Sequence, residues 1–283
     1  MISIKNGRPS HLVDTQDRAF LYGDGFFTTV RITQGEPHLW QRHIDRLIDC
    51  AEKLAFDVDI EEVEQQLFSF LAEHPDLSGA IKIIISRGIG ERGYMPPEQK
   101  SDVHLHVFPR HSAALPDDIK SSGVLVGGIK NARKTPVHSG LMQLTLGHTM
   151  PALVGLKTLN RLEQVLLRHE LANTPWGEGL VADMQGNLVE GVSSNCFFYI
   201  NKKWFTPILD QAGIVGIMRA EILDRMLEND IPHSIVNVPK AAIDQIEAMF
   251  YCNALTGIVP VKSLANRRLA LGPVQQLIDQ FEL

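Results

Sequence analysis

Three short strand patterns separated by tight turns in the second half of the chain restrict the fold more than any other feature. Runs rich in β-branched, aromatic and other apolar residues cover 180–183, 188–192 and 196–200. The glycine-containing turn 185–187 joins the first two runs, and the polar turn 201–203 follows the third. Strands joined by so few residues pair antiparallel. The sequence therefore predicts a sheet built from hairpins in this half.

The first hundred residues instead alternate between strand and helix patterns. Strands are expected at 2–4, 26–32, 81–85 and 103–108, and helices at 43–54 and 60–71. A polar stretch at 113–121 reads as a linker. We therefore expect an α+β chain with an N-terminal α/β domain over 1–112 and a strand-rich C-terminal domain over 122–283.

Charge and cysteine content exclude several functional classes. The formal net charge of -6 is wrong for a nucleic-acid surface, which needs clustered positive charge. No apolar run is long enough to cross a bilayer, and the first residues lack the apolar core of a signal peptide. The three cysteines have no metal-type spacing. These features favour a cytoplasmic protein without membrane or nucleic-acid partners.

One lysine stands in an unusual setting. Lys157 follows Pro151 and Gly155, which make a continuous upstream helix improbable, and it precedes a helix pattern for which Asn160 is the expected cap. Partial burial at such an edge lowers the pKa of an amine and frees it to attack carbonyls, as in Schiff-base enzymes. Taken alone, this segment favours a solvated surface lysine.

Two further segments fit the binding of a phosphorylated, pyridine-containing cofactor. Glu190 lies between strands, where a carboxylate beside a pyridine nitrogen keeps that nitrogen protonated. The glycine-flanked turn 211–216 runs into a helix, and helix N-termini favour phosphate. Each pattern also has an ordinary structural explanation, as a strand-end carboxylate or as a glycine-rich helix entry.

Two other patterns are weaker. The glycines of 88–93 match a dinucleotide-binding pattern, but the next expected element is a strand, whereas that motif requires a helix. His104 and His106 share one face of a strand, but no carboxylate or cysteine accompanies them at ligand spacing. We therefore expect solvated histidines and no metal site.

Taken together, the motifs resemble the fold-type IV pyridoxal-phosphate enzymes, the group that contains the branched-chain and D-amino-acid aminotransferases. They occur in family order across nearly the whole chain. The segments that carry the resemblance are 17–19, 22–29, 43–47, 86–94, 157–164, 209–213, 216–219 and 252–255. The resemblance implies a two-domain architecture with a smaller N-terminal domain and a larger, pseudo-barrel C-terminal domain.

The resemblance also assigns roles to individual residues. Lys157 would be the Schiff-base lysine and the general base and acid, Glu190 would pair with the pyridine nitrogen, and Arg46 would hold the phosphate. The other cofactor-binding positions would be Ser194, Asn195, Ile217, Met218, Asn253 and Ala254. The substrate-binding positions would be Phe27, Thr29, Arg31, Arg92 and Tyr94.

The Lys157–Gln164 run favours one activity within this group. The resemblance implies a lyase reaction that converts 4-amino-4-deoxychorismate into 4-aminobenzoate and pyruvate, a step of folate biosynthesis, in a homodimer. An aminotransferase on the same scaffold and a cofactor-free binding module are the alternatives. The segment 127–150 is longer than the family leads us to expect.

Overall fold

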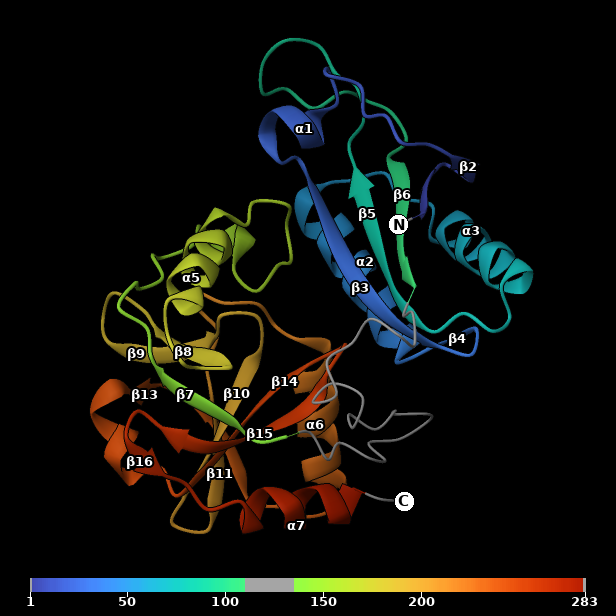
Figure 1. Cartoon of the computed structure of the whole chain (residues 1–283). Coiled ribbons are helices and arrows are strands. Elements are labelled where there is room, and N and C mark those ends of the chain that lie inside the picture. Colours follow the sequence, from blue (N-terminus) through green and yellow to red (C-terminus); the bar gives the residue numbers. More distant parts are fainter. Residues whose placement is uncertain (1, 110–134, 282–283) are drawn as a thin grey trace. The chain divides into compact units, whose positions relative to one another are not determined.

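The computed structural model describes residues 2–109 and 135–281 (Figure 1). This part of the chain forms two compact units. The first contains residues 2–109 and the short segment Leu156–Asn160, and the second contains residues 135–155 and 161–281. The expected linker at 113–121 and residues 127–134 of the longer segment 127–150 lie outside the described residues.

The first unit is built on a six-stranded sheet whose pairings are all antiparallel. Its order is β2-β1-β6-β5-β3-β4. The strands are β1 (Ile2–Lys5), β2 (Arg8–Pro9), β3 (Gly25–Thr33), β4 (Glu36–Pro37), β5 (Gly79–Ser86) and β6 (Asp102–Pro109). The helices are α1 (Arg18–Tyr22), α2 (Trp40–Leu54) and α3 (Ile60–Glu73).

Strand β3 has one face in the hydrophobic core and an opposite face that carries predicted substrate residues. Phe26, Val30 and Ile32 on one side of the strand are at most 1% exposed, and α2 packs against β3. The alternating residues Phe27 and Arg31 lie on the opposite face, because successive strand residues point to opposite sides. The strand therefore presents three predicted substrate residues, Phe27, Thr29 and Arg31, on a single face.

The second unit contains a ten-stranded sheet and confirms the strand-rich half that was predicted. The predicted hairpins are present, since β8 pairs antiparallel with β9 and β10 with β11. At the end of the sheet β9 contacts β10 and β13 contacts β11, so the sheet curls back on itself. Its strands are β7 (Val137–Leu141), β8 (Glu178–Ala182), β9 (Asn187–Gly191), β10 (Asn195–Ile200), β11 (Lys203–Pro207), β12 (His233–Val236), β13 (Val238–Pro239), β14 (Ala248–Asn253), β15 (Gly257–Leu264) and β16 (Arg267–Arg268).

Helices surround this sheet. They are α5 (Leu162–Ala172), α6 (Ile217–Glu228) and α7 (Gly272–Phe281), with 3-10 turns at Pro151–Leu153 and Lys240–Gln245. Helices α6 and α7 both contact β14. Among residues 2–109 and 135–281, no helix combines the length and apolar character needed to span a bilayer.

The segment Leu156–Asn160 packs with the first unit, whereas we expected Lys157 to belong to the second domain. The physical reason is backbone pairing with β3. The Phe27 N–H donates to the Lys157 carbonyl at 3.0 Å, and the Leu159 N–H donates to the Gly25 carbonyl at 2.9 Å. Five residues thus extend the first sheet at the end where β3 begins.

The expectation that Asn160 caps the following helix is wrong. Arg161 occupies the N-cap position of α5, and no side chain caps the helix there. The Asn160 amide instead donates to the Gly23 carbonyl at 3.2 Å. Its side chain therefore fastens the lysine segment to the turn before β3.

Candidate active site

The predicted site residues fall into two groups, one in each unit. In the first unit, Lys157 is half-buried beside β3, and its Nζ lies 4.6 Å from the centre of the Phe27 ring. A cation above an aromatic face is attracted by the negative face of the ring. Phe27 therefore supports the side chain of Lys157 as well as its backbone.

A second lysine, which the sequence did not reveal, shares this ring. Lys82 on β5 is paired with Thr29, and its Nζ lies 4.1 Å from the centre of the Phe27 ring. Burial lowers the pKa of Lys82. Two amines around one phenyl ring make a strongly electropositive region, which suits an anionic substrate. The strand pattern gave no signal for Lys82, because a lone lysine on a strand is usually solvated.

Helix α2 brings the predicted phosphate residue toward the same segment. Burial lowers the pKa of Arg46 to about 10, so the guanidinium remains charged at neutral pH. One turn later lies Cys50. Burial raises the pKa of the Cys50 thiol, and a hydrogen bond with the Lys157 backbone acts in the opposite direction. Cys50 thus lies near both the Arg46 side chain and the Lys157 backbone.

His43 lies one turn before Arg46 and is buried. The Nδ1 atom of His43 lies 2.6 Å from the Thr28 hydroxyl, while its Nε2 is buried without a hydrogen-bond partner. Burial, and to a lesser degree the charge of Arg46, lowers the pKa of His43 to about 3. A neutral imidazole here avoids placing a second positive charge in the core beside Arg46.

This lowered pKa predicts a loss of stability in acid. Between pH 6.5 and about 3, the unfolded chain binds a proton at His43 that the folded protein does not. Stability should therefore be complete above about pH 6.5 and should fall with decreasing pH by roughly 1.4 kcal/mol per pH unit from this group. Urea unfolding at pH 7 and pH 5 measures the effect. Between pH 7 and pH 5, the free energy of unfolding of His43→Gln should fall by about 2 kcal/mol less than that of the wild type. An equal fall in both proteins would contradict the assignment.

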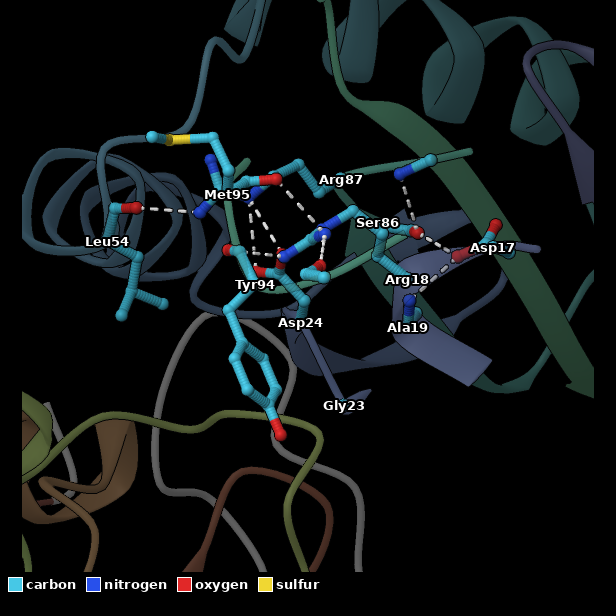
Figure 2. Close-up of polar contacts among 12 residues, drawn as sticks. Asp17, Arg18, Ala19, Gly23, Asp24, Leu54, Ser86, Arg87, Tyr94 and Met95 are labelled. Atoms are coloured by element: carbon cyan, nitrogen blue, oxygen red, sulfur yellow. Dashed lines mark hydrogen bonds and ion pairs between the residues drawn. The ribbon is translucent and has the colours of Figure 1, made fainter. Parts of the chain in front are cut away.

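The predicted substrate residues Arg92 and Tyr94 lie on the loop between β5 and β6, and both side chains are exposed. No helix follows the glycines of this loop before β6, so the rejection of a dinucleotide motif is consistent with the structure. The backbone of the loop is held by polar contacts to Arg18 (Figure 2). Arg92 and Tyr94 therefore project from a fixed piece of chain.

His104 differs from the solvated histidine that we expected. It is 9% exposed, and its ring stacks on that of His106 with centroids 6.5 Å apart. The fold also brings Asp17 and Asp102 to His104, with candidate ligand atoms within 4.8 Å of one another. The Lys5 ammonium lies 2.7 Å from Asp102 and 3.9 Å from Asp17, so it supplies positive charge to this cluster. The absence of a metal remains a prediction.

In the second unit, Glu190 is the central charged group. It lies on β9, is 5% exposed, and accepts the Ile214 N–H at 2.9 Å. Asn195 on β10 donates its amide to the Ile214 carbonyl at 2.9 Å. Gly213 adopts a φ of 88°, and a Cβ there would lie 3.2 Å from the Glu190 carboxylate. Only glycine allows this turn to pass so close to Glu190.

The turn that carries Ser194 is held by a carboxylate that the sequence analysis did not single out. Glu178 on β8 is 8% exposed and accepts the hydroxyls of Ser193 and Ser194 at 3.0 and 2.9 Å. It also accepts the Val192 N–H at 3.0 Å. One carboxylate thus accepts three hydrogen bonds from the turn 192–194 and fixes its conformation. No local sequence pattern indicated a role for Glu178, because its partners are about fifteen residues away in the chain.

Asn253 orders the neighbouring turn. Its Oδ1 accepts the Leu255 and Thr256 N–H groups at 3.0 and 2.8 Å, and its amide donates to the Ser193 carbonyl at 3.3 Å. Asn195 pairs with Cys252 across β10 and β14. The fold therefore brings the predicted positions 194, 195, 253 and 254 to one end of two adjacent strands.

The start of α6 completes this group. Ile217 and Met218 are its first residues, no side chain caps the helix, and no acidic residue lies in its first turn. The preceding Gly216 leaves room for Asn195, whose Oδ1 would collide with a Cβ at position 216. Uncapped N–H groups at a helix start, next to a polar turn, are suited to binding phosphate.

Gly216→Ala should therefore weaken cofactor binding. The added Cβ displaces Asn195, and such overpacking costs about 1–3 kcal/mol. We expect the dissociation constant for pyridoxal phosphate, measured by fluorescence titration, to rise roughly tenfold. Gly272→Ala is the matched control, since it also stands at a helix start and its Cβ would meet nothing within 4 Å. In a Gly216→Ala, Asn195→Ala double variant, the added Cβ no longer meets the Asn195 side chain. The dissociation constant should then rise little beyond that of Asn195→Ala alone.

These two groups contain the donor types that pyridoxal phosphate requires. An amine for the aldehyde is present at Lys157, and an acid for the pyridine nitrogen at Glu190. Arg46 contributes a cation and the start of α6 contributes N–H groups that no side chain caps, and both kinds of group bind phosphate. Gly216 lets the Asn195 side chain lie against the start of α6, where no side chain caps the N–H groups. The residues therefore fit the cofactor.

Comparisons with known proteins agree with these features. Residues 25–264 match the amino-transferase class IV family. The chain is similar to the aminodeoxychorismate lyase of Vibrio harveyi, with 30% identity over 92% of this chain and 90% of that one. It is also similar to a putative branched-chain-amino-acid aminotransferase of Methanocaldococcus jannaschii, with 28% identity over 90% of this chain and 83% of that one. The crystal structure of 4-amino-4-deoxychorismate lyase from Pseudomonas aeruginosa superposes with a TM-score of 0.86 and 34% identity, covering 99% of this chain and 97% of that one.

Proposed function

The chain belongs to the amino-transferase class IV family, and from that premise we propose that it is a pyridoxal-phosphate-dependent lyase that forms 4-aminobenzoate and pyruvate from 4-amino-4-deoxychorismate. The observation that supports this most strongly is the similarity to two proteins named as lyases of this substrate, the V. harveyi and P. aeruginosa enzymes. In each case the similarity covers at least 90% of this chain and of the relative. Lys157, which is half-buried with its amine over the Phe27 ring, supplies the amine that the reaction needs.

Lys157 has two roles in the proposed reaction. Its amine would hold the cofactor aldehyde. With substrate bound, the same amine would remove the proton from the carbon that bears the substrate nitrogen, as a general base. The C–O bond to the enolpyruvyl group then breaks, Lys157 returns the proton to the leaving group, and the ring becomes aromatic. Pyruvate and 4-aminobenzoate account for all the atoms of the substrate.

Bound pyridoxal phosphate supplies an electron sink for the negative charge that develops at this carbon. Glu190 keeps that sink effective by holding a proton on the pyridine nitrogen. The backbone N–H of Ile214 fixes one oxygen of Glu190 and so orients its carboxylate. Arg46, the start of α6 and positions 194, 195, 253 and 254 are proposed to hold the phosphate.

The substrate carries two carboxylates, and the first unit offers cations for them. Arg92 has a planar guanidinium that can bind both oxygens of a carboxylate. Lys82 adds a second positive charge at the Phe27 ring. Phe27 and Thr29 are proposed to line the pocket, Tyr94 to accompany Arg92, and Arg31 to contribute from the same face of β3.

A coupled assay tests the proposal. Purified protein is mixed with chorismate, glutamine and a synthase that forms 4-amino-4-deoxychorismate, and the products are separated by chromatography. Equal amounts of 4-aminobenzoate and pyruvate are expected. The proposal fails if the substrate accumulates while the protein carries its full complement of pyridoxal phosphate.

An aminotransferase is the second candidate, and the M. jannaschii relative favours it. It would convert the cofactor into its amine form when an amino acid is added alone, and this change is visible in the absorbance spectrum. A lyase need not do so. The third possibility, a binding module without cofactor, predicts protein that stays colourless after incubation with pyridoxal phosphate.

We also propose a homodimer in the cytoplasm. In the second unit, Leu162, Val165 and Leu166 on α5 are 78%, 60% and 58% exposed, and only Leu167 and Leu171 of this helix are buried. Three exposed apolar side chains on one helix favour burial against another chain. Light scattering after size exclusion should give twice the chain mass of 31.5 kDa.

A further inference from the structure

The loop 88–101 between β5 and β6 has an unusual combination of a fixed backbone and free side chains. Tyr94 and Met95 are 85% and 83% exposed. Their carbonyl groups nevertheless accept hydrogen bonds from Arg18, which is 3% exposed. Exposed loops are usually more mobile than the elements that they connect. Here a buried side chain from α1 supplies the order.

Arg18 contacts three consecutive carbonyls. Its Nη1 donates to Gly93 at 2.9 Å and to Met95 at 3.3 Å, and its Nη2 donates to Tyr94 at 3.0 Å (Figure 2). The Arg18 N–H donates to the Gly88 carbonyl at 2.9 Å. Gly90 permits this approach, since a Cβ there would lie 2.8 Å from Arg18 Cδ. The guanidinium therefore replaces the regular hydrogen bonds that this part of the loop lacks.

Asp24 fixes the guanidinium itself. Arg18 Nε donates to Asp24 at 2.8 Å, and Arg87 Nε donates to the same carboxylate at 3.0 Å. The Nη atoms of Arg87 donate to the Leu54 and Ala55 carbonyls at the end of α2, both at 2.8 Å. A cation at a helix C-terminus is favourable. One continuous network, visible in Figure 2, thus joins the loop to the helix that carries Arg46.

We propose that Arg18 is a positioning residue for substrate binding, which it serves by holding the loop so that Arg92 meets the substrate carboxylate. Arg92 lies immediately before the three carbonyls that Arg18 holds. Ordering this loop during folding removes an entropic cost that binding would otherwise carry. The inference deepens the proposed function and rests on it for the role of Arg92.

The test compares Arg18→Lys with the wild type. Lysine keeps the positive charge, but its single nitrogen cannot serve three carbonyls and Asp24 together. Limited digestion with trypsin, followed by mass spectrometry, should show cleavage after Arg92 about tenfold faster, the equivalent of one hydrogen bond to a charged group. The KM for 4-amino-4-deoxychorismate should rise about tenfold, with kcat within about threefold of the wild type.

A double-mutant cycle separates positioning from general damage. In an Arg92→Ala background, Arg18→Lys should no longer raise KM, because the group that it positions is gone. Arg8→Lys, an exposed arginine on β2, is the matched control and should change neither cleavage nor KM. If Arg18→Lys does not fold, Asp24→Asn replaces it and should shift both measurements in the same direction.

Two results would overturn the inference: unchanged cleavage after Arg92, or a rise in KM that is as large in the Arg92→Ala background. Failure of the proposed function is recognised separately. In that case the wild type releases no 4-aminobenzoate, and only the part of the inference that concerns substrate binding is lost. The cleavage rates still decide whether Arg18 holds the loop.

Discussion

Lys157→Ala should abolish turnover and remove the visible absorbance of protein incubated with pyridoxal phosphate. Loss of a general base alone lowers rates by about 10²–10⁴-fold, and this variant also loses the amine that holds the cofactor. We therefore expect kcat to fall by at least about 10⁴-fold. The fold should survive, because the segment pairs with β3 through the backbone of Lys157 and Leu159, which alanine retains.

Lys53→Ala provides the control for this variant. Lys53 is an exposed lysine on α2 that pairs with Asp49 one turn earlier, and its removal should leave activity and absorbance unchanged. The sharper challenge comes from Lys82, whose amine lies over the same Phe27 ring. Borohydride reduction followed by peptide mapping distinguishes the two. A reduced adduct on Lys82, or near-normal activity of Lys157→Ala, would contradict the assignment.

Local sequence patterns predicted the elements of the fold well. The turn 211–216 was predicted to run into a helix, and α6 begins at Ile217; the predicted hairpin turn at 185–187 joins β8 to β9. These features depend on neighbours in the chain, namely apolar periodicity and turn residues. For the same reason, the strand at 26–32 was predicted, and in the structure the alternation of β3 places Phe27 and Thr29 on one face.

What the sequence did not predict depends on partners far away in the chain. Asn160 has the residue type and position of a helix cap, but Gly23 lies close enough to accept its amide. Lys82 lies over the Phe27 ring, and Glu178 accepts hydrogen bonds from the turn at 192–194. No rule of sequence spacing predicts either contact. The same holds for Asp17 and His104. Long-range contacts of this kind arise only when the sheets are assembled.

The resemblance to a family identified the chemical groups, and the structure adds what supports them. Several of the predicted site segments are held by partners far away in the chain. Glu190 is oriented by the Ile214 N–H, Ser194 by Glu178, and the loop with Arg92 by Arg18. Reactive groups need such support to keep a productive geometry. Variants of the supporting residues should therefore affect the reaction without touching the substrate.

Glu190→Gln should lower kcat by about 10²–10³-fold, which is the usual effect of removing one electrostatic stabiliser from a transition state. The substitution is well suited to isolate charge. Glu190 accepts the Ile214 N–H through Oε2, and the amide oxygen of glutamine can accept the same bond. The neutral side chain no longer holds a proton on the pyridine nitrogen, so the electron sink weakens while the turn at 213–214 keeps its hydrogen bond.

Three measurements on Glu190→Gln separate chemistry from binding. Single-turnover kinetics should show the full loss, the dissociation constant for pyridoxal phosphate should change by less than about tenfold, and the melting temperature should stay within a few degrees of the wild type. Glu247→Gln is the matched control, because Glu247 is exposed and also accepts a backbone N–H, that of Asn201, at 2.8 Å. If Glu190→Gln kept its rate, the carboxylate would serve only to orient the turn, and the proton on the pyridine would need another source.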